Sequence, residues 1–321
     1  MKNSEVTLAS PFHQRLSAYL SERFPLFSHI SMVIIYFLAN QFLAQVLSNP
    51  GQPLIVGWFS ILGMLFLFCL FFHLRVFDEH KDYEDDCRYY PKRVLSRGLV
   101  TLRDLKILGG IAIAGELIIA ASVGTPALVA SVATIFFSWV MLHEFFVRNW
   151  LRSHFILYAI AHMLIMPLMA ATIFSFTMHR PFWEAPTLFW AYALADFFAF
   201  SNWEISRKIR VPEDEIEGVS SYSKELGMFT AGYVVIGLRI LNTLLAWMIG
   251  YYLKLGVFYY IGLIVLFLGT LAGLLHFRLK PCHQTAKNLE AYGGFYIILF
   301  YFVLAAELFR THGVTFFGGS L

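Results

Sequence analysis

The sequence predicts an all-α, polytopic membrane protein built as one bundle of about nine transmembrane helices. Of its 321 residues, 58% are hydrophobic and only 14% are charged, whereas a soluble domain carries about 25% charged residues. Apolar stretches of bilayer-spanning length, about 20 residues each, recur along the chain between short polar segments. The surplus of apolar side chains must therefore face lipid.

The first element is an amphipathic segment. Residues 1–25 begin polar and then carry apolar residues at helical spacing from Phe12 to Phe24, with Arg15 and Arg23 alongside. This pattern predicts a helix that lies in the membrane interface and leads into the first span.

Nine spans are expected after this segment, separated by turn-forming residues such as Asn49-Pro50-Gly51. No linker or low-complexity segment divides the chain, so residues 1–321 are expected to form a single transmembrane domain. The predicted spans are residues 27–47, 53–75, 106–122, 125–145, 153–177, 183–203, 226–252, 256–277 and 289–308.

Lysine and arginine are distributed unevenly between the two sides of these spans. With the N-terminus in the cytosol, 20 of the 24 basic residues fall in cytosolic segments, as the positive-inside rule expects. The two longest loops, 76–105 and 204–225, then lie on the cytosolic face. The net charge of +3 is interpreted as this orientation signal, and no nucleic-acid partner is expected.

The first long loop carries a run of acidic residues beside the end of a span. Asp78, Glu79, Asp82 and Asp86 follow the pattern acid-acid-x-x-acid-x-x-x-acid, with Lys92-Arg93 downstream. On a helix, the three aspartates form a stripe of like charges that is unfavourable unless a cation neutralises it. Carboxylates that hold a hard cation, near basic residues that hold phosphate, indicate a diphosphate site. A solvated acidic loop is the alternative.

This segment resembles the first signature of the UbiA superfamily of intramembrane prenyltransferases, Asn-Asp-x-x-Asp-x-x-x-Asp after the second span. Here Asp78 and Glu79 stand for the leading Asn and Asp, and Asp82 and Asp86 occupy the later positions. Nine spans and a second acidic loop also match, so the resemblance covers nearly the whole chain. Val94 replaces a proline that is common in the family.

The second signature of the family is an aspartate motif after span six, followed by Gly and Ser. Gly218 and Ser221 stand at the expected places, and Glu204 and Asp214 are the best matches to metal ligands. Basic residues follow Glu204 where further aspartates are usual, so the second metal ion is expected to be bound differently or by fewer ligands.

The resemblance implies an enzyme in which Mg²⁺ holds the diphosphate of an isoprenoid. Ionisation leaves an allylic cation, which a lipophilic or aromatic acceptor, such as a quinone precursor, then takes up. The implied metal ligands are Asp78, Glu79, Asp82, Asp86, Glu204 and Asp214, of which Asp78, Asp82 and Glu204 are the catalytic candidates. The candidate diphosphate contacts are Lys92, Arg93, Arg207, Lys208 and Arg239. A membrane terpene cyclase of the same fold, acting on an isoprenyl diphosphate, is the alternative.

Polar residues within the predicted spans are costly and call for explanation. Arg239 is expected either to bind the diphosphate or to pair with Asp196, and the role of Glu116 is equally open. His154 and His162 are interpreted as packing residues rather than as a haem or metal site.

Overall fold

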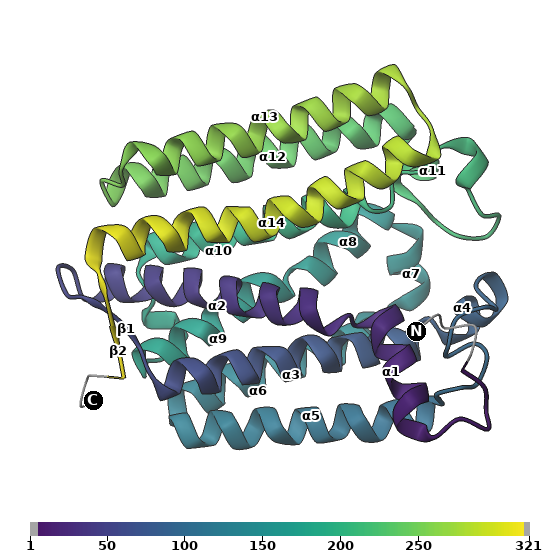
Figure 1. The fold of residues 1–321 in the computed structure, drawn as a ribbon, viewed down its shortest axis with the longest axis horizontal. Coiled ribbons are helices and arrows are strands. Elements are labelled where there is room, and N and C mark those ends of the chain that lie inside the picture. Colours follow the sequence, from purple (N-terminus) through teal and green to yellow (C-terminus); the bar gives the residue numbers. More distant parts are fainter. Residues whose placement is uncertain (1–5, 318–321) are drawn as a thin grey trace.

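A computed structural model describes residues 6–317 as a bundle of long helices that run roughly side by side (Figure 1). In the view of Figure 1, α12 and α13 form one edge of the bundle and α5 forms the other. The helices are α1 (Phe12–Arg23), α2 (Leu26–Ser48), α3 (Trp58–Lys81), α4 (Tyr83–Tyr89), α5 (Leu102–Val123), α6 (Thr125–Leu142), α7 (Arg148–Ser153), α8 (Phe155–Met163), α9 (Ile165–Met178), α10 (Thr187–Ser206), α11 (Tyr222–Leu226), α12 (Met228–Tyr252), α13 (Val257–Leu279) and α14 (His283–His312).

The remaining elements are short. They are the single 3₁₀ turns η2 (Glu144–Phe146), η3 (Phe182–Glu184) and η4 (Pro212–Asp214) and the strands β1 (Leu54–Val56) and β2 (Val314–Phe316). The two strands pair in parallel, with Leu54 opposite Val314. This pairing ties the segment before α3 to the end of the chain that follows α14.

The prediction of about nine spans is confirmed in outline. Within residues 6–317, eight segments are long and apolar enough to cross a membrane, with α8 and α9 counted as one. Pro167 lies in the first turn of α9, where its ring disfavours an unbroken helix and accounts for the break. The predicted span that is missing from these eight is the sixth, residues 183–203, which corresponds to α10, whose Asp196, Asn202 and Glu204 are all buried. This helix is more polar because protein surrounds it.

The second span begins and ends later than expected. Residues 53–75 were predicted, whereas α3 runs from Trp58 to Lys81. Residues 54–56 are taken up by β1, and Asp78 and Glu79 lie inside the last turns of the helix. The first two acidic residues are therefore held on a helix and not on a loop.

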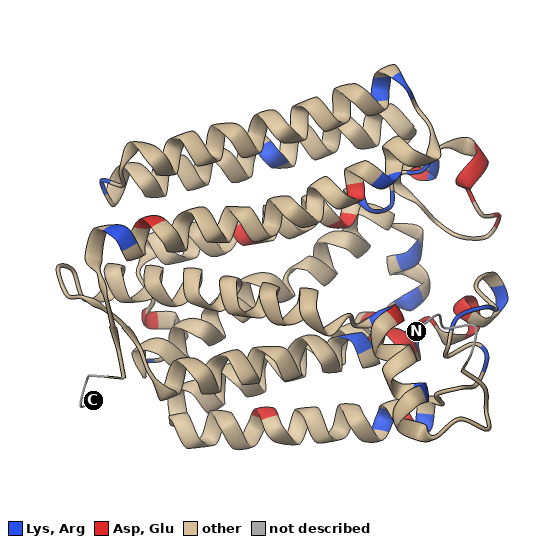
Figure 2. Ribbon diagram, viewed as in Figure 1, with Lys and Arg blue, Asp and Glu red and all other residues tan. Residues whose placement is uncertain are grey.

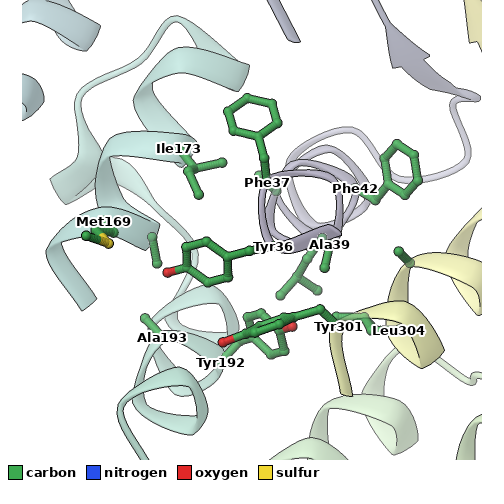
Figure 3. Packing of buried hydrophobic residues seen from close by; sticks show 14 of the residues in the cluster. Tyr36, Phe37, Ala39, Phe42, Met169, Ile173, Tyr192, Ala193, Tyr301 and Leu304 are labelled. Atoms are coloured by element: carbon green, nitrogen blue, oxygen red, sulfur yellow. The ribbon is translucent and has the colours of Figure 1, made fainter. Parts of the chain in front are cut away.

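The main core is rich in aromatic side chains. The rings of Tyr36 and Tyr301 lie 4.8 Å apart, edge to face, and Tyr192 also packs against Tyr301. Figure 3 shows these three side chains converging from three different helices. Large apolar side chains on the outside, such as Phe27 and Ile118, stay exposed, as a lipid-facing surface requires.

Charged side chains gather mainly at one end of the bundle, around α4, α7 and α11 (Figure 2). We call this the charged end. It contains the two segments 76–105 and 204–225 that the sequence marked as active-site loops. The placement of α1 in the membrane interface and of this end in the cytosol both remain predictions.

The contact between α3 and α5 gives a test of the packing. A Cβ atom on Gly109 would lie 2.9 Å from Cγ1 of buried Val76, whereas one on neighbouring Gly110 would meet nothing within 4 Å. We therefore expect Gly109→Ala to destabilise the fold by about 1–3 kcal/mol, because the rigid valine cannot yield easily. Gly110→Ala should be neutral or stabilise by up to about 1 kcal/mol. Thermal unfolding followed by tryptophan fluorescence in one detergent compares them, and equal midpoints would contradict this packing.

Candidate active site

The three aspartates of the first motif keep helical register across a joint between two helices. Asp78 lies near the end of α3, Asp82 joins α3 to α4, and Asp86 lies in α4. The backbone N–H of Asp82 donates to the carbonyl of Asp78 at 2.9 Å, and that of Asp86 donates to the carbonyl of Asp82 at 2.8 Å. The predicted carboxylate stripe is therefore preserved although the helix is not continuous.

Asp78 is partly exposed and has two basic neighbours on its own helix. Its side chain is 46% exposed and lies 3.2 Å from Nζ of Lys81 and 3.8 Å from Nη1 of Arg75. Both partners are three residues away along α3, so helical periodicity alone would have found them. They offset part of the charge of Asp78 without enclosing it.

Glu79 and Asp86 have a different environment, because both form ion pairs with arginines. Nε of Arg23, on α1, lies 2.6 Å from the carboxylate of Glu79, whose side chain is only 1% exposed. The same arginine approaches Asp86 at 3.5 Å, and Arg93 forms an ion pair with Asp86. Of the four acidic residues, these two serve as anchors for α1 and for the segment after α4.

Asp82 carries an electrostatic cost. Burial raises the pKa of its carboxyl group above the ordinary value, and the neighbouring charges of Asp78 and Asp86 raise it further, against the opposing effect of Lys81 and Lys208. A nearby divalent cation would relieve this repulsion. The stripe therefore has the electrostatic property that a cation site requires.

Glu204 anchors the second motif at the end of α10. Its carboxylate lies 2.6 Å from Nε of Arg207 and 2.7 Å from Nζ of Lys208. Burial alone would lower the pKa of Arg207, but Glu204, and after it Asp78 and Glu290, raise it above the ordinary value. Arg207 thus interacts with carboxylates of both motifs.

The two charged segments, far apart in the sequence, meet at the charged end. Nη2 of Arg210 donates to the hydroxyl of Tyr90 at 3.4 Å. Gly218 has a φ of +83°, and a Cβ atom there would lie 2.8 Å from Cζ of Tyr89. Only glycine allows both this backbone conformation and this approach. The glycine of the second motif therefore closes one segment onto the other.

The other predicted residues lie further from this meeting point or in other environments. Asp214, in η4, accepts a hydrogen bond from Nδ1 of His283 at 2.8 Å, at the start of α14. Lys92 is exposed after α4. Among the described residues, neither forms a hydrogen bond or ion pair with Asp78, so the assignments of Asp214 to a metal ion and of Lys92 to diphosphate stay predictions.

Arg239 is deeply buried and has partners that the sequence did not indicate. Its Nη2 donates to the side chain of Asn202 at 2.6 Å, and its guanidinium lies 3.0 Å from the ring centre of Tyr296. The alternative that it pairs with Asp196 is wrong, because no ion pair within residues 6–317 joins the two, and Asp196 instead accepts a hydrogen bond from Tyr301. Its assignment to the diphosphate remains a prediction.

A small hollow lies beside Asp78, inside the charged end. Its volume is about 10 Å³, enough for roughly one water molecule. Leu74, Phe77, Met141 and Leu142 supply apolar walls, and Asp78, Lys81, Ser138 and His162 supply polar groups. Lys81 and Ser138 were not among the predicted site residues, and His162 was interpreted as a packing residue. Lys81 could have been found from the sequence, because a residue three positions after Asp78 lies on the same face of a helix. Ser138 could not, because it lies on α6, which only the fold brings close to Asp78.

The carboxylates fit a hard divalent cation that binds together with a phosphate ligand. Within the described residues, no three Asp, Glu, His or Cys side chains form a ready-made metal site. Mg²⁺, however, is usually held by one or two carboxylates, with waters and substrate phosphates completing its shell. Asp78 and Asp82 offer that number of oxygen ligands, and the repulsion at Asp82 favours a cation there.

No protein-family model and no curated protein matches the sequence. Solved structures do match the fold. A digeranylgeranylglyceryl phosphate synthase is similar with a TM-score of 0.61 at 18% identity, over 92% of this chain and 99% of the other. The apo structure of a UbiA homolog from Aeropyrum pernix K1 is similar with a TM-score of 0.64 at 16% identity, over 86% of this chain and 97% of the other.

A third structure, of a UbiA homolog from Archaeoglobus fulgidus bound to GPP and Mg²⁺, has a TM-score of 0.48 at 14% identity. That likeness is too weak to carry anything over to this chain. The two better matches span nearly the whole of both chains, and they establish that this bundle has the UbiA fold.

The closure of the two segments can be tested at Gly218. Gly218→Ala should cost about 1–2 kcal/mol from the left-handed backbone alone, and the collision with Tyr89 adds to it. We expect faster hydrogen exchange in both segments, 76–105 and 204–225. Gly51→Ala is the matched control, because Gly51 has a similar φ of +80° but nothing within 4 Å of a Cβ atom. Unchanged exchange in segment 76–105 of Gly218→Ala would show that the segments do not support each other.

The cost of the Asp82 carboxylate predicts a stabilising substitution. Because the pKa of Asp82 is raised in the folded state, its ionised carboxylate lowers the stability of the fold at pH values above the ordinary Asp pKa of about 4. This loss of stability disappears as the pH falls below that value. Asp82→Asn should therefore melt higher than the parent protein at pH 7 by roughly 1 °C, and the difference should disappear at acidic pH. Mg²⁺ should raise the melting point of the parent but not of the variant.

Asp85→Asn is the control for this substitution, because Asp85 lies three residues further along, in α4, with a side chain that is 59% exposed. Equal stabilisation by both variants would indicate a general charge effect and not repulsion within the stripe.

Proposed function

We propose that the protein is an intramembrane prenyltransferase that transfers an isoprenyl group from an isoprenyl diphosphate to a lipophilic acceptor and depends on Mg²⁺. The observation that carries this proposal is the meeting of two charged segments at one end of an apolar bundle. One contributes Asp78 and Asp82, and the other contributes Arg207 and Lys208, with Glu204 between these two basic residues. The UbiA fold supports the same function, as does the structural similarity to a digeranylgeranylglyceryl phosphate synthase.

The charges suit a diphosphate because they come in both signs. Asp78 and Asp82 would hold Mg²⁺, which when bound neutralises the diphosphate and improves it as a leaving group. Arg207 and Lys208 would donate hydrogen bonds to the diphosphate oxygens. Glu204 keeps these two cations in place until the substrate arrives. Lys92, Arg93 and Arg239 remain further proposed contacts.

The apolar bundle suits the isoprenyl chain. Breaking the C–O bond leaves an allylic cation that water would destroy, so the reaction needs a site from which water is excluded. The walls beside Asp78, formed in part by Phe77 and Leu74, are apolar, and an aromatic face can stabilise a cation. The proposed acceptor, an aromatic or quinone-precursor molecule, would enter the same apolar region from the membrane.

A second candidate is a terpene cyclase of the same fold. The observation in its favour is the cluster of aromatic rings in the main core, where Tyr36, Tyr192, Phe200 and Tyr301 pack edge to face or tilted (Figure 3). Such rings could stabilise a cation that migrates along a folded chain. A cyclase would release a hydrocarbon or alcohol from the diphosphate without any acceptor.

The proposal predicts the effect of Asp78→Asn. Purified protein in nanodiscs would receive radiolabelled geranylgeranyl diphosphate, Mg²⁺ and a membrane lipid extract as the source of acceptor. Released diphosphate and extracted prenyl products would be measured. Loss of a metal-binding carboxylate should lower diphosphate release by about 100-fold or more. The melting point should stay unchanged or fall slightly, because the partly exposed ion pairs of Asp78 with Lys81 and Arg75 are lost.

Glu184→Gln is the matched control, because Glu184 is an accessible acidic residue in η3, outside the two charged segments, and its partner is Arg180. It should retain full activity. Full activity of Asp78→Asn would refute the metal assignment, and a cyclised product formed without the lipid extract would favour the cyclase.

A further inference from the structure

Three buried polar side chains from three helices form a hydrogen-bonded chain next to the hollow. Nδ1 of His73, on α3, lies 2.6 Å from Oε1 of Glu116, on α5. Nε2 of the same imidazole lies 2.9 Å from Oγ of Ser138, on α6. All three residues have no exposed surface. The order Ser138–His73–Glu116 is thus a continuous path for a proton within the bundle.

One end of this chain reaches the hollow beside Asp78. Ser138 lines the hollow together with Asp78 and Lys81, whereas Glu116 lies at the other end of the path and its Oε2 has no hydrogen-bond partner. His73 and Asp78 are five residues apart on α3, which is about 7–8 Å along the helix axis. A proton released beside Asp78 would need to pass only one hydroxyl group to reach the imidazole.

The hydrogen bonds around Ser138 allow two arrangements. Its hydroxyl lies 2.9 Å from Nε2 of His73 and 2.7 Å from the carbonyl oxygen of Ile135. When Ser138 donates to His73, the neutral imidazole donates from Nδ1 to the Glu116 carboxylate. When Ser138 donates to Ile135 instead, Nε2–H donates to Ser138, and the His73–Glu116 pair holds one additional proton. Only hydrogen atoms move between the two arrangements.

We infer that His73 and Glu116, acting through Ser138, accept the proton that the acceptor loses when it is prenylated. The inference rests on the proposed function. An allylic cation that bonds to a neutral C–H or O–H acceptor gives a cationic adduct, and this adduct must lose one proton to become a neutral product. Water that traps the cation must lose a proton in the same way.

The transfer balances without any further reagent. A water molecule in the hollow would take the proton from the adduct and pass one of its own to Oγ of Ser138, while the Ser138 hydroxyl proton moves to Nε2 of His73. The imidazole becomes protonated on both nitrogens, and the Glu116 carboxylate compensates its charge through the bond at Nδ1. The proton returns to water by the reverse path once the product has left. Ser138 faces the hollow from which the proton comes, whereas His73 and Glu116 act through Ser138.

A purely structural role would not require ionisable groups. The same bundle joins α6 to α9 with a neutral pair, Thr134 and Thr172, whose hydroxyls lie 2.8 Å apart and are buried. A carboxyl group and an imidazole are much more expensive than threonines inside a membrane protein, and such residues usually serve function. The Thr134–Thr172 pair therefore also provides a matched control.

The test is positional isotope exchange in geranylgeranyl diphosphate that carries oxygen-18 at the bridging position. When the cation is not captured productively, it returns to the diphosphate and scrambles the label. The ratio of scrambling to total prenyl product, alcohol included, therefore reports proton removal whichever acceptor is used. The protein would be assayed in nanodiscs with Mg²⁺ and the membrane lipid extract as the acceptor probe.

Glu116→Gln should raise this ratio by about 10-fold or more, and His73→Asn should do the same, with unchanged binding of Mg²⁺ and inorganic diphosphate. Thr172→Val, which removes the neutral hydrogen bond, should leave the ratio as in the parent protein. If both variants fold and keep the ratio of the parent protein, or if scrambling and product fall equally, the proton path is refuted but the proposed function is not. A parent protein that neither scrambles nor consumes the substrate would refute the proposed function, and the relay with it.

Discussion

The structure depends on how carboxylates are neutralised at one end of a bundle that is otherwise apolar. Each acidic residue of the two motifs meets a different form of this constraint. Glu79 and Glu204 are compensated at 2.6 Å by Arg23 and Arg207, whereas burial, with the nearby charges of Asp78 and Asp86, raises the pKa of Asp82 despite the opposing effect of its basic neighbours. The compensated carboxylates position helices, whereas Asp82 is the one whose ionised form is disfavoured, as expected for a carboxylate at the proposed cation site. Stability and function thus separate along a single stretch of sequence.

The same constraint explains why α10 differs from the other long helices. It is buried on most sides, and it carries both the end of the second motif and the polar residues Asn202 and Asp196. A lipid-facing helix could not tolerate these groups, but a central helix can pair each of them with a neighbour, as Asn202 does with Arg239. The second motif of the candidate site therefore begins on the helix that the rest of the bundle shields.

The sequence predicted the number of spans in outline and the two charged segments, because hydrophobic length and charge pattern are local properties. It could not predict which acids would be compensated. The partner of Glu79 lies 56 residues away on α1, and the approach of Gly218 to Tyr89 depends on the path of four intervening spans. The Ser138–His73–Glu116 chain was invisible for the same reason, since each residue taken alone reads as an isolated polar group in a span.

The mixture of signs at the charged end has a consequence for the order of binding. A metal ion alone would approach Asp78 and Asp82 but would be repelled by Lys81, Arg207 and Lys208. A diphosphate alone would meet the opposite balance, attracted by the cations and repelled by the carboxylates. A magnesium diphosphate complex carries both charges at once. Its metal ion can meet the carboxylates while its phosphate oxygens meet the basic side chains, so no buried charge is left unpaired. In the proposed reaction, the departure of the isoprenyl cation makes the diphosphate more negative, while the charges of the surrounding side chains stay the same. The proton path through His73 then starts beside this diphosphate.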